Sequence, residues 1–176
     1  SIYLRLSTRT INQPQRTITP QLEKDILGGA YWMIEPNKDS PLAIIYTGTV
    51  VPEVLDAFND LKEDIPGLGL LSITSSDRLY HDWQRSLTIS ENREQPHLER
   101  LFSQLNRKAA LITVQDGHPA NLSWIGATTG RRVYPLGLTE FGQSGNLPDL
   151  FRTYKIDADA IIQMAARASI DLASPR

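Results

Sequence analysis

The sequence predicts an α/β domain, specifically a three-layer α/β/α sandwich on a mixed five-stranded sheet with one antiparallel strand. Short, continuous apolar runs such as residues 42–46 (LAIIY) are typical of strands that are buried on both faces. Segments with helical apolar spacing alternate with these runs, which indicates βαβ crossovers and a mainly parallel sheet. Only six residues separate the expected strands 31–35 and 42–46, too few for a helical crossover. These two strands therefore either form a hairpin or lie antiparallel within the sheet.

The N-terminal 20 residues differ from the rest of the chain. Residues 1–6 have the pattern of a strand, whereas residues 7–20 are polar and aperiodic, as in a linker. Because the sequence starts inside a strand, we expect it to be a fragment of a longer protein. Residues 1–20 would be the tail strand of a preceding domain with its linker, and residues 21–176 the α/β domain itself.

The remaining elements follow in order. Thr19 is expected to cap a helix that starts at Pro20 and stops at Gly28-Gly29. The expected strands are residues 31–35, 42–46, 68–74, 110–114 and 133–138. The expected helices lie near residues 52–65, from Ser75 onward, at 98–105, around Leu122 and Ile125, and at 147–154. The helix from Ser75 carries Leu79, Trp83 and Leu87. A last helix, capped by Asp157, is expected to bury Ile161, Ala165, Ala168 and Leu172. Residues 90–95 are expected to be a loop.

Composition excludes several classes of function. With 40% hydrophobic and 22% charged residues, the chain has the make-up of a soluble globular protein. Its net charge of -2 and its scattered basic residues argue against nucleic-acid binding, since the nearest approach to a basic cluster is the pair Arg131-Arg132. There is no cysteine, which excludes disulfides and thiolate chemistry and fits a cytoplasmic protein. No apolar run approaches the roughly 20 residues that span a bilayer, so no membrane partner is expected.

Candidate ligand-binding residues lie where the parallel strands end, because open α/β sheets bind ligands beyond the carboxyl ends of their strands. These candidates are Thr47 and Gly48 after the second strand, Ser75, Asp77 and Arg78 after the third, Asp116 and His118 after the fourth, and Gln143 and Ser144 after the fifth. Arg78 could contact a phosphate or a carboxylate, whereas Asp77 is better placed to cap the helix that follows.

A nucleotide-binding function lacks its motifs, since neither GxGxxG nor GxxxxGK[ST] occurs. A flavodoxin-like module remains an alternative, because the loop Thr47-Gly48-Thr49 could hold a flavin phosphate.

Asp116 and His118 could form an acid/base pair, which makes a small hydrolase another alternative. The competing interpretation is that Asp116 caps the next helix while His118 bonds to nearby backbone. No nucleophile accompanies the pair, because Ser123 lacks the GxSxG elbow. His81 and His97 are expected to be solvated, and the three histidines lack the spacing of metal ligands.

The three tryptophans, Trp32, Trp83 and Trp124, appear too dispersed to form a stacking platform, so core or interface packing is expected for each.

Several segments resemble a known family. Residues 136–145 (LGLTEFGQSG), continuing to Asp157, resemble the closing Phe-Gly-x-Ser motif of transketolases. Residues 46–54, 69–79 and 116–126 are similar to the homodimeric type of pyruvate dehydrogenase, and residues 3–9 resemble the last strand of the pyrimidine-binding domain that precedes this one in that family. The likeness covers nearly the whole chain, with its segments in the family's order.

The resemblance implies the C-terminal structural and interaction domain of a thiamine-diphosphate-dependent 2-oxoacid dehydrogenase, an oxidoreductase acting on pyruvate, with a true transketolase as the alternative. Its implied partners are the preceding pyrimidine- and pyrophosphate-binding domains, a second subunit in a homodimer, and a lipoyl acyltransferase component. Thiamine diphosphate and Mg²⁺ would bind to the parent enzyme and not to this chain, which lacks the Gly-Asp-Gly motif. No catalytic residue is therefore carried over.

Overall fold

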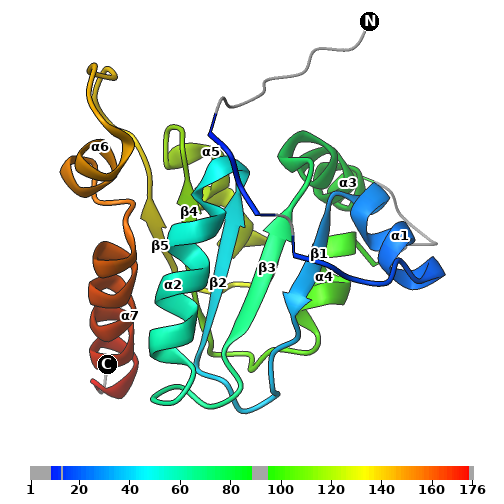
Figure 1. Cartoon of the computed structure of the whole chain (residues 1–176). Helices are drawn as coiled ribbons and strands as arrows, with labels where there is room; N and C mark the ends of the chain where they lie inside the picture. Colours follow the sequence, from blue (N-terminus) through cyan, green and yellow to red (C-terminus); the bar gives the residue numbers. More distant parts are fainter. Residues whose placement is uncertain (1–8, 13, 89–94, 175–176) are drawn as a thin grey trace, which may run out of the picture.

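The computed structural model describes residues 9–12, 14–88 and 95–174. Its sheet has the order β1-β3-β2-β4-β5, in which β1 runs antiparallel to β3 and the other pairs are parallel (Figure 1). The strands are β1 (Ala30–Ile34), β2 (Leu42–Thr47), β3 (Gly69–Ile73), β4 (Ala110–Gln115) and β5 (Val133–Leu136). The predicted fold class is confirmed. Of the two arrangements left open, β1 adopts the second: it pairs with β3 and forms no hairpin with β2.

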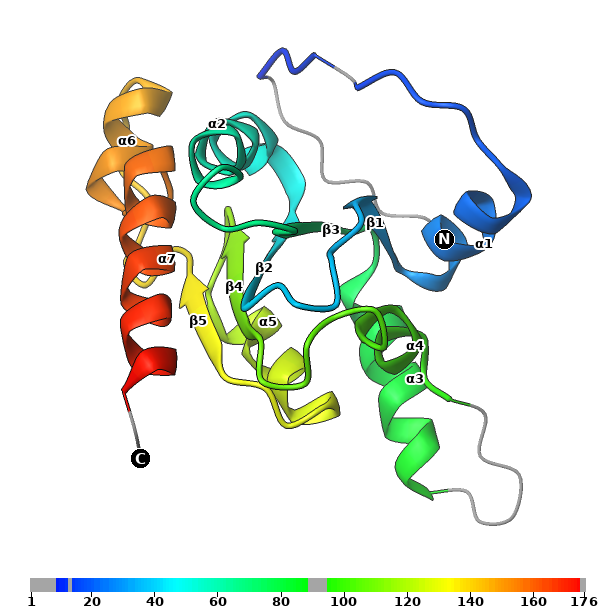
Figure 2. The same cartoon turned by 90° about the horizontal axis from the view of Figure 1, so that it is seen from below.

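Helices cover both faces of the sheet, as the view along the sheet shows (Figure 2). One face carries α2 (Val51–Leu61), α6 (Leu147–Thr153) and α7 (Ala158–Ala173), and the other carries α3 (Ser76–Thr88), α4 (His97–Phe102) and α5 (Ala120–Ser123). Two 3₁₀ turns, η1 (Gly48–Val50) and η2 (Trp124–Thr128), extend the connections, and α1 (Pro20–Gly28) lies beside β1. The chain is therefore a three-layer sandwich.

Burial patterns explain the position of each strand in the sheet. The three central strands are buried at almost every position, whereas the edge strands β1 and β5 alternate between buried and exposed residues. Pro135 has no N–H to donate, and it is tolerated in β5 because this strand lies at the edge.

Two apolar cores result, one on each face. The first joins β2–β5 to α2, α6 and α7, and the second joins β1–β4 to α3, α4 and η2. Each large aliphatic side chain buried here contributes about 1.5–3 kcal/mol to stability. The fully buried set includes Leu42, Ile44, Ile45, Leu70, Leu71, Leu111 and Ile112. Because the cores lie on opposite faces of the same strands, neither helical layer can be removed without exposing half of each strand.

The predicted helix ends are confirmed at both termini of the fold. Thr19 accepts a hydrogen bond from the N–H of Leu22 (3.2 Å), and Asp157 accepts one from Ala160 (3.1 Å). Gly29 ends α1 with a φ of 110°, a conformation that favours glycine.

Two expectations about helices were wrong. Leu172 was expected to be buried, but it is 38% exposed because the last turn of α7 extends beyond the first core. The helix expected at 98–105 ends at Phe102, although Leu105 is still buried in the turn that follows. The expected strand at 1–6 lies outside the described residues, as does most of the expected loop at 90–95.

A polar network fastens α7 to β5. The hydroxyl of Tyr134 donates to the carboxylate of Asp171 (2.9 Å), which also forms ion pairs with Arg132 (3.1 Å) and Arg167 (3.2 Å). These three donors, led by Tyr134, lower the pKa of Asp171 below its usual value. The charged form of Asp171 is therefore favoured in the folded chain.

This network gives stability a defined pH dependence. Because the native pKa of Asp171 is depressed, its contribution is complete above the unfolded pKa and is lost as pH falls through the native value. Asp171→Asn is expected to lower the thermal midpoint at pH 7, and its difference from the unaltered chain should shrink below about pH 4. Calorimetry across this range is the measurement, with Asp60→Asn, at an exposed position on α2, as the control. A deficit of constant size at every pH would contradict the assignment.

Candidate interdomain surface at the carboxyl edge of the sheet

The carboxyl ends of β2, β3, β4 and β5 lie at one edge of the sheet, the upper edge in Figure 1. Every candidate residue predicted from the sequence follows one of these strands. The structure divides the candidates into four separate groups with different local roles.

Thr47 and Gly48 form the first group, at the end of β2. The hydroxyl of Thr47 donates to the carbonyl of Ile73 (3.0 Å) and so ties β2 to β3. Gly48 has a φ of 80°, and the position of an added Cβ would be open. The hydroxyl of Thr47, one of the two in the loop that could hold a flavin phosphate, is thus engaged by the backbone of a neighbouring strand.

Ser75, Asp77 and Arg78 form the second group and hold the end of α1. Ser75 donates to Asp77 (2.6 Å), and this hydrogen bond, followed by the backbone N–H of Arg78, lowers the pKa of Asp77. Arg78 donates to the carbonyl of Leu27 (2.6 Å), a partner within the fold and not a ligand. Asp77 and Arg78 also line an open hollow of about 980 Å³ between α1 and α3.

Asp116 and His118 form the third group, after β4. His118 is exposed, its Nδ1 accepts a hydrogen bond from the N–H of Ala120 (3.2 Å), and its carbonyl accepts one from Gln115 (2.6 Å). The Nδ1 atom is therefore engaged by a backbone N–H at the first turn of α5. Because Nδ1 is the acceptor, the neutral ring carries its hydrogen on Nε2, which can donate a hydrogen bond. A general-base role for His118 stays a proposal and would require Nδ1 to be released from Ala120.

The loop that holds Asp116 and His118 is locked to the loop after β5. The N–H of Leu138 donates to the carbonyl of Gly117 (2.8 Å). A Cβ on Gly137 would lie 2.5 Å from that same carbonyl oxygen, so only glycine permits this approach.

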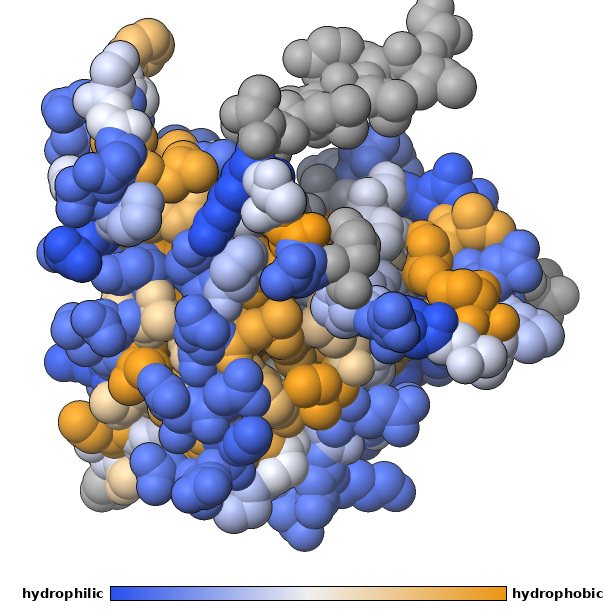
Figure 3. All heavy atoms as spheres, viewed as in Figure 1, coloured by the Kyte–Doolittle hydropathy of each residue, from blue (hydrophilic) through white to orange (hydrophobic). Residues whose placement is uncertain are grey.

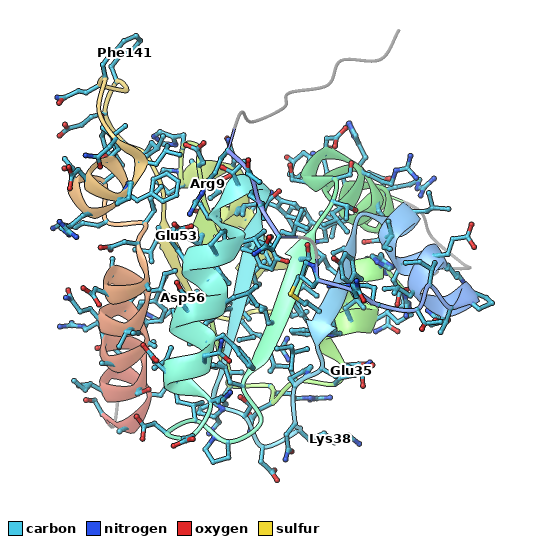
Figure 4. All side chains as sticks on the ribbon, in the orientation of Figure 1. Arg9, Glu35, Lys38, Glu53, Asp56 and Phe141 are labelled. Carbon is cyan, nitrogen blue, oxygen red and sulfur yellow. The ribbon has the colours of Figure 1, made fainter. Side chains whose placement is uncertain are left out.

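Gln143 and Ser144 form the fourth group, on an arm at residues 139–146 that is exposed throughout. At its tip, Phe141 is 97% exposed (Figure 4). The hydroxyl of Tyr154 accepts from the N–H of Gln143 (3.1 Å) and donates to the carbonyl of Phe141 (3.1 Å). The arm is therefore held open by α6, with an aromatic ring presented to solvent.

An ion pair that the sequence did not reveal lies at the same edge. Arg9 makes two hydrogen bonds to the carboxylate of Glu53 on α2 (2.9 and 2.8 Å), and Figure 4 shows the two residues facing each other. The guanidinium also donates to the carbonyl of Thr49 (3.4 Å) and lies over the ring of Phe151 (5.4 Å). The hydrogen bond to Glu53 raises the pKa of Arg9. The two partners are 44 residues apart in sequence, so no local pattern could have paired them.

Arg9 anchors a linker segment that crosses the sheet. From Arg9 the chain passes the carboxyl edge and runs over the β1–β3 part of the face that α2 leaves uncovered (Figure 1). Arg16 lies over the ring of Tyr31 (4.9 Å), and a small hollow of about 200 Å³ remains between the segment and the sheet. Apolar side chains continue onto the outer surface of α1 (Figure 3), where Leu27 is 60% exposed.

Two expectations about polar and aromatic residues were wrong. His97 was expected to be solvated, but it is partly buried and its Nε2 bonds to the carbonyl of Ala30 (2.7 Å). Trp83 and Trp124 were expected to lie apart, yet their rings stack at 5.6 Å and 21°, with Tyr80 packed against both. The fold brings α3 beside η2, a contact that sequence distance conceals.

Among residues 9–12, 14–88 and 95–174, no group of three or more His, Asp or Glu side chains is arranged to hold a metal ion. No helix in this part of the chain is both long enough and apolar enough to cross a membrane.

The carboxyl edge carries loops that are tied to one another, an anchored linker and a projecting aromatic arm.

Comparison with known proteins shows which family shares this architecture. The sequence profile of the transketolase-like TK C-terminal domain matches residues 29–157. The chain belongs to this family. No curated protein matches the sequence with comparable significance.

Solved transketolases share the fold of this transketolase-like domain. It matches transketolase from Leishmania mexicana with a TM-score of 0.61 at 14% identity, covering 86% of this chain and 19% of that one. Transketolase from Campylobacter jejuni matches with a TM-score of 0.59 at 20% identity, covering 81% and 19%. A split-gene transketolase described as an inactive beta4 tetramer matches with a TM-score of 0.56 at 15% identity, covering 80% and 42%. The chain therefore spans about a fifth of the length of the first two proteins.

The Arg9–Glu53 pair generates a prediction about the linker. A bidentate, part-buried pair of this kind contributes about 1 kcal/mol. Glu53→Gln should therefore release the segment and speed tryptic cleavage after Arg16 roughly fivefold, followed by mass spectrometry. Glu63→Gln, at an exposed position beyond the end of α2, is the matched control. Equal cleavage rates in the two variants would show that Arg9 does not hold the linker.

Proposed function

We propose that this chain is the C-terminal domain of a thiamine-diphosphate-dependent 2-oxoacid dehydrogenase, of the homodimeric type that acts on pyruvate. It braces the dimer, borders the entrance to the active site and is not catalytic alone. The observation that carries this proposal is the anchored linker. Arg9 holds the incoming chain at the carboxyl edge, beside the loops that follow β2, β4 and β5. The first described residues therefore lie at the edge where open α/β sheets present their loops.

The choice of enzyme class is supported by sequence. Residues 46–54, 69–79 and 116–126 resemble the pyruvate dehydrogenase type, and these are the segments that form the carboxyl edge. A true transketolase is the second candidate, favoured by the Phe-Gly-x-Ser sequence at residues 141–144 and by the solved structures that share the fold.

In the proposed parent enzyme, thiamine diphosphate with Mg²⁺ supplies the electron sink for decarboxylation of the 2-oxoacid. The preceding pyrimidine- and pyrophosphate-binding domains would hold it. The residues of this chain position loops and exclude water at the entrance. A cytoplasmic location, a homodimer and an acceptor lipoyl acyltransferase complete the proposal.

Cofactor binding tests the assignment of the chain itself. Isothermal calorimetry of this chain with thiamine diphosphate and Mg²⁺ should show no binding. Micromolar affinity would contradict the proposal that the preceding domains, and not this chain, bind the cofactor. For the parent enzyme, pyruvate-dependent reduction of an artificial electron acceptor is expected, and ketol transfer between sugar phosphates without it would favour transketolase.

The exposed arm tests the bracing role. Removing an aromatic anchor from an interface typically costs 2 kcal/mol or more, so Phe141→Ala should raise the dimer dissociation constant of the parent enzyme at least tenfold. The thermal midpoint of the isolated chain should not change, because the ring makes almost no contact there. Ile170→Ala, which removes an exposed apolar side chain on α7, is the matched control. Analytical ultracentrifugation would contradict the role if both variants dimerised as the unaltered enzyme does.

A further inference from the structure

A hollow of about 560 Å³ lies at the opposite edge of the sheet, between the turn after α4 and the turn after η2. Arg107 and Arg131 line it and precede the first residues of β4 and β5, so it opens at the amino ends of these strands. Its volume falls within the range of about 300–1,000 Å³ that is usual for small-molecule sites.

Arg131 is fixed in place by the backbone. Its Nε donates to Asn106 (3.2 Å), and its Nη2 donates to the carbonyls of Phe102, Leu105 and Asn106 (3.1–3.2 Å), which closes the end of α4. The ring of Phe102 lies under the guanidinium (5.5 Å). Within the described residues, no hydrogen bond engages Nη1. The side chain is therefore preorganised, with one pair of donors unused.

Positive charge in the hollow is not neutralised by an ion pair. Within the described chain, neither Arg107 nor Arg131 forms a salt bridge with a carboxylate, and Arg107 is exposed. Burial and the nearby charge of Arg107 both lower the pKa of Arg131. Among the described residues that line the hollow, two arginines outnumber one acid, Glu99, which favours an anion beside the guanidinium groups.

Thr129 adds a polar group without a partner. It lines the hollow, and its Oγ1 is buried and forms no hydrogen bond. A buried hydroxyl of this kind costs free energy until a partner is supplied.

We propose that this hollow binds a small phosphorylated metabolite that carries hydroxyl groups. Its phosphate would lie between Arg107 and the Nη1 of Arg131, with the hydroxyl of Thr129 as a third donor. Its hydroxyl groups would reach Gln95, which lines another part of the hollow and supplies an acceptor oxygen. The site uses only residues of this chain and is independent of the proposed parent enzyme.

The test is the thermal midpoint of this chain, titrated with glycerol 3-phosphate at constant ionic strength. A ligand that binds only the folded state raises the midpoint with concentration. Arg107→Gln should weaken the apparent affinity at least tenfold, because it removes half of the clamp and no contact within the fold. Lys108→Gln removes the same charge one residue away, outside the hollow, and should bind as the unaltered chain does. Equal titrations for these two variants, or no shift in the unaltered chain at millimolar ligand, would overturn the proposal.

Two further experiments separate the contributions of the groups that form the site. Thr129→Val keeps the shape of the side chain and removes the unpaired hydroxyl, so the ligand-free midpoint should hold or rise while the ligand-induced shift decreases. Inorganic phosphate should bind several-fold more weakly than glycerol 3-phosphate, and glycerol should not bind. If phosphate bound equally well, the metabolite's hydroxyl groups would have no role, and that part of the proposal would be wrong.

Discussion

The structure depends on the burial of β2, β3 and β4 on both faces. Nearly every side chain of these strands is inaccessible to water, so two layers of helices are required to cover them. This constraint places the helices, and through them the loops at the two edges. It also explains why the candidate polar residues lie where the strands end, since the faces are filled by apolar packing.

The linker is a second covering element, because α2 does not cover the whole of its face. Tyr31 and Met33 of β1 line a small hollow together with residues 11, 12, 14 and 16 of the N-terminal segment, and α2 contributes only its first residue, Val51, to this lining. The segment that enters the domain is therefore also part of its outer layer.

Much of the fold was predictable because its signals are local. Apolar runs located the five strands, and Thr19, Gly29 and Asp157 marked helix ends through side-chain and backbone chemistry that acts within three or four residues. The sequence did not determine which strand lies beside β1. The six residues between the expected strands 31–35 and 42–46 exclude a helical crossover, but they do not select a neighbour for the first strand. The sites were less predictable: Arg9 with Glu53, and Trp83 with Trp124, meet only through tertiary contacts. Arg131 and Arg132 are adjacent in sequence and were the nearest approach to a basic cluster, but they contact different helices. Arg131 donates to the end of α4, and Arg132 forms an ion pair with Asp171 on α7.

The composition of β5 limits how copies of this domain could assemble. The strand has only four residues, and Pro135 removes one of the few donors that an added strand would need. Continuous sheet formation across that edge is therefore disfavoured, and any association at β5 would rely on side chains and loops. Pro135 thus protects this side of the domain from polymerisation through its backbone.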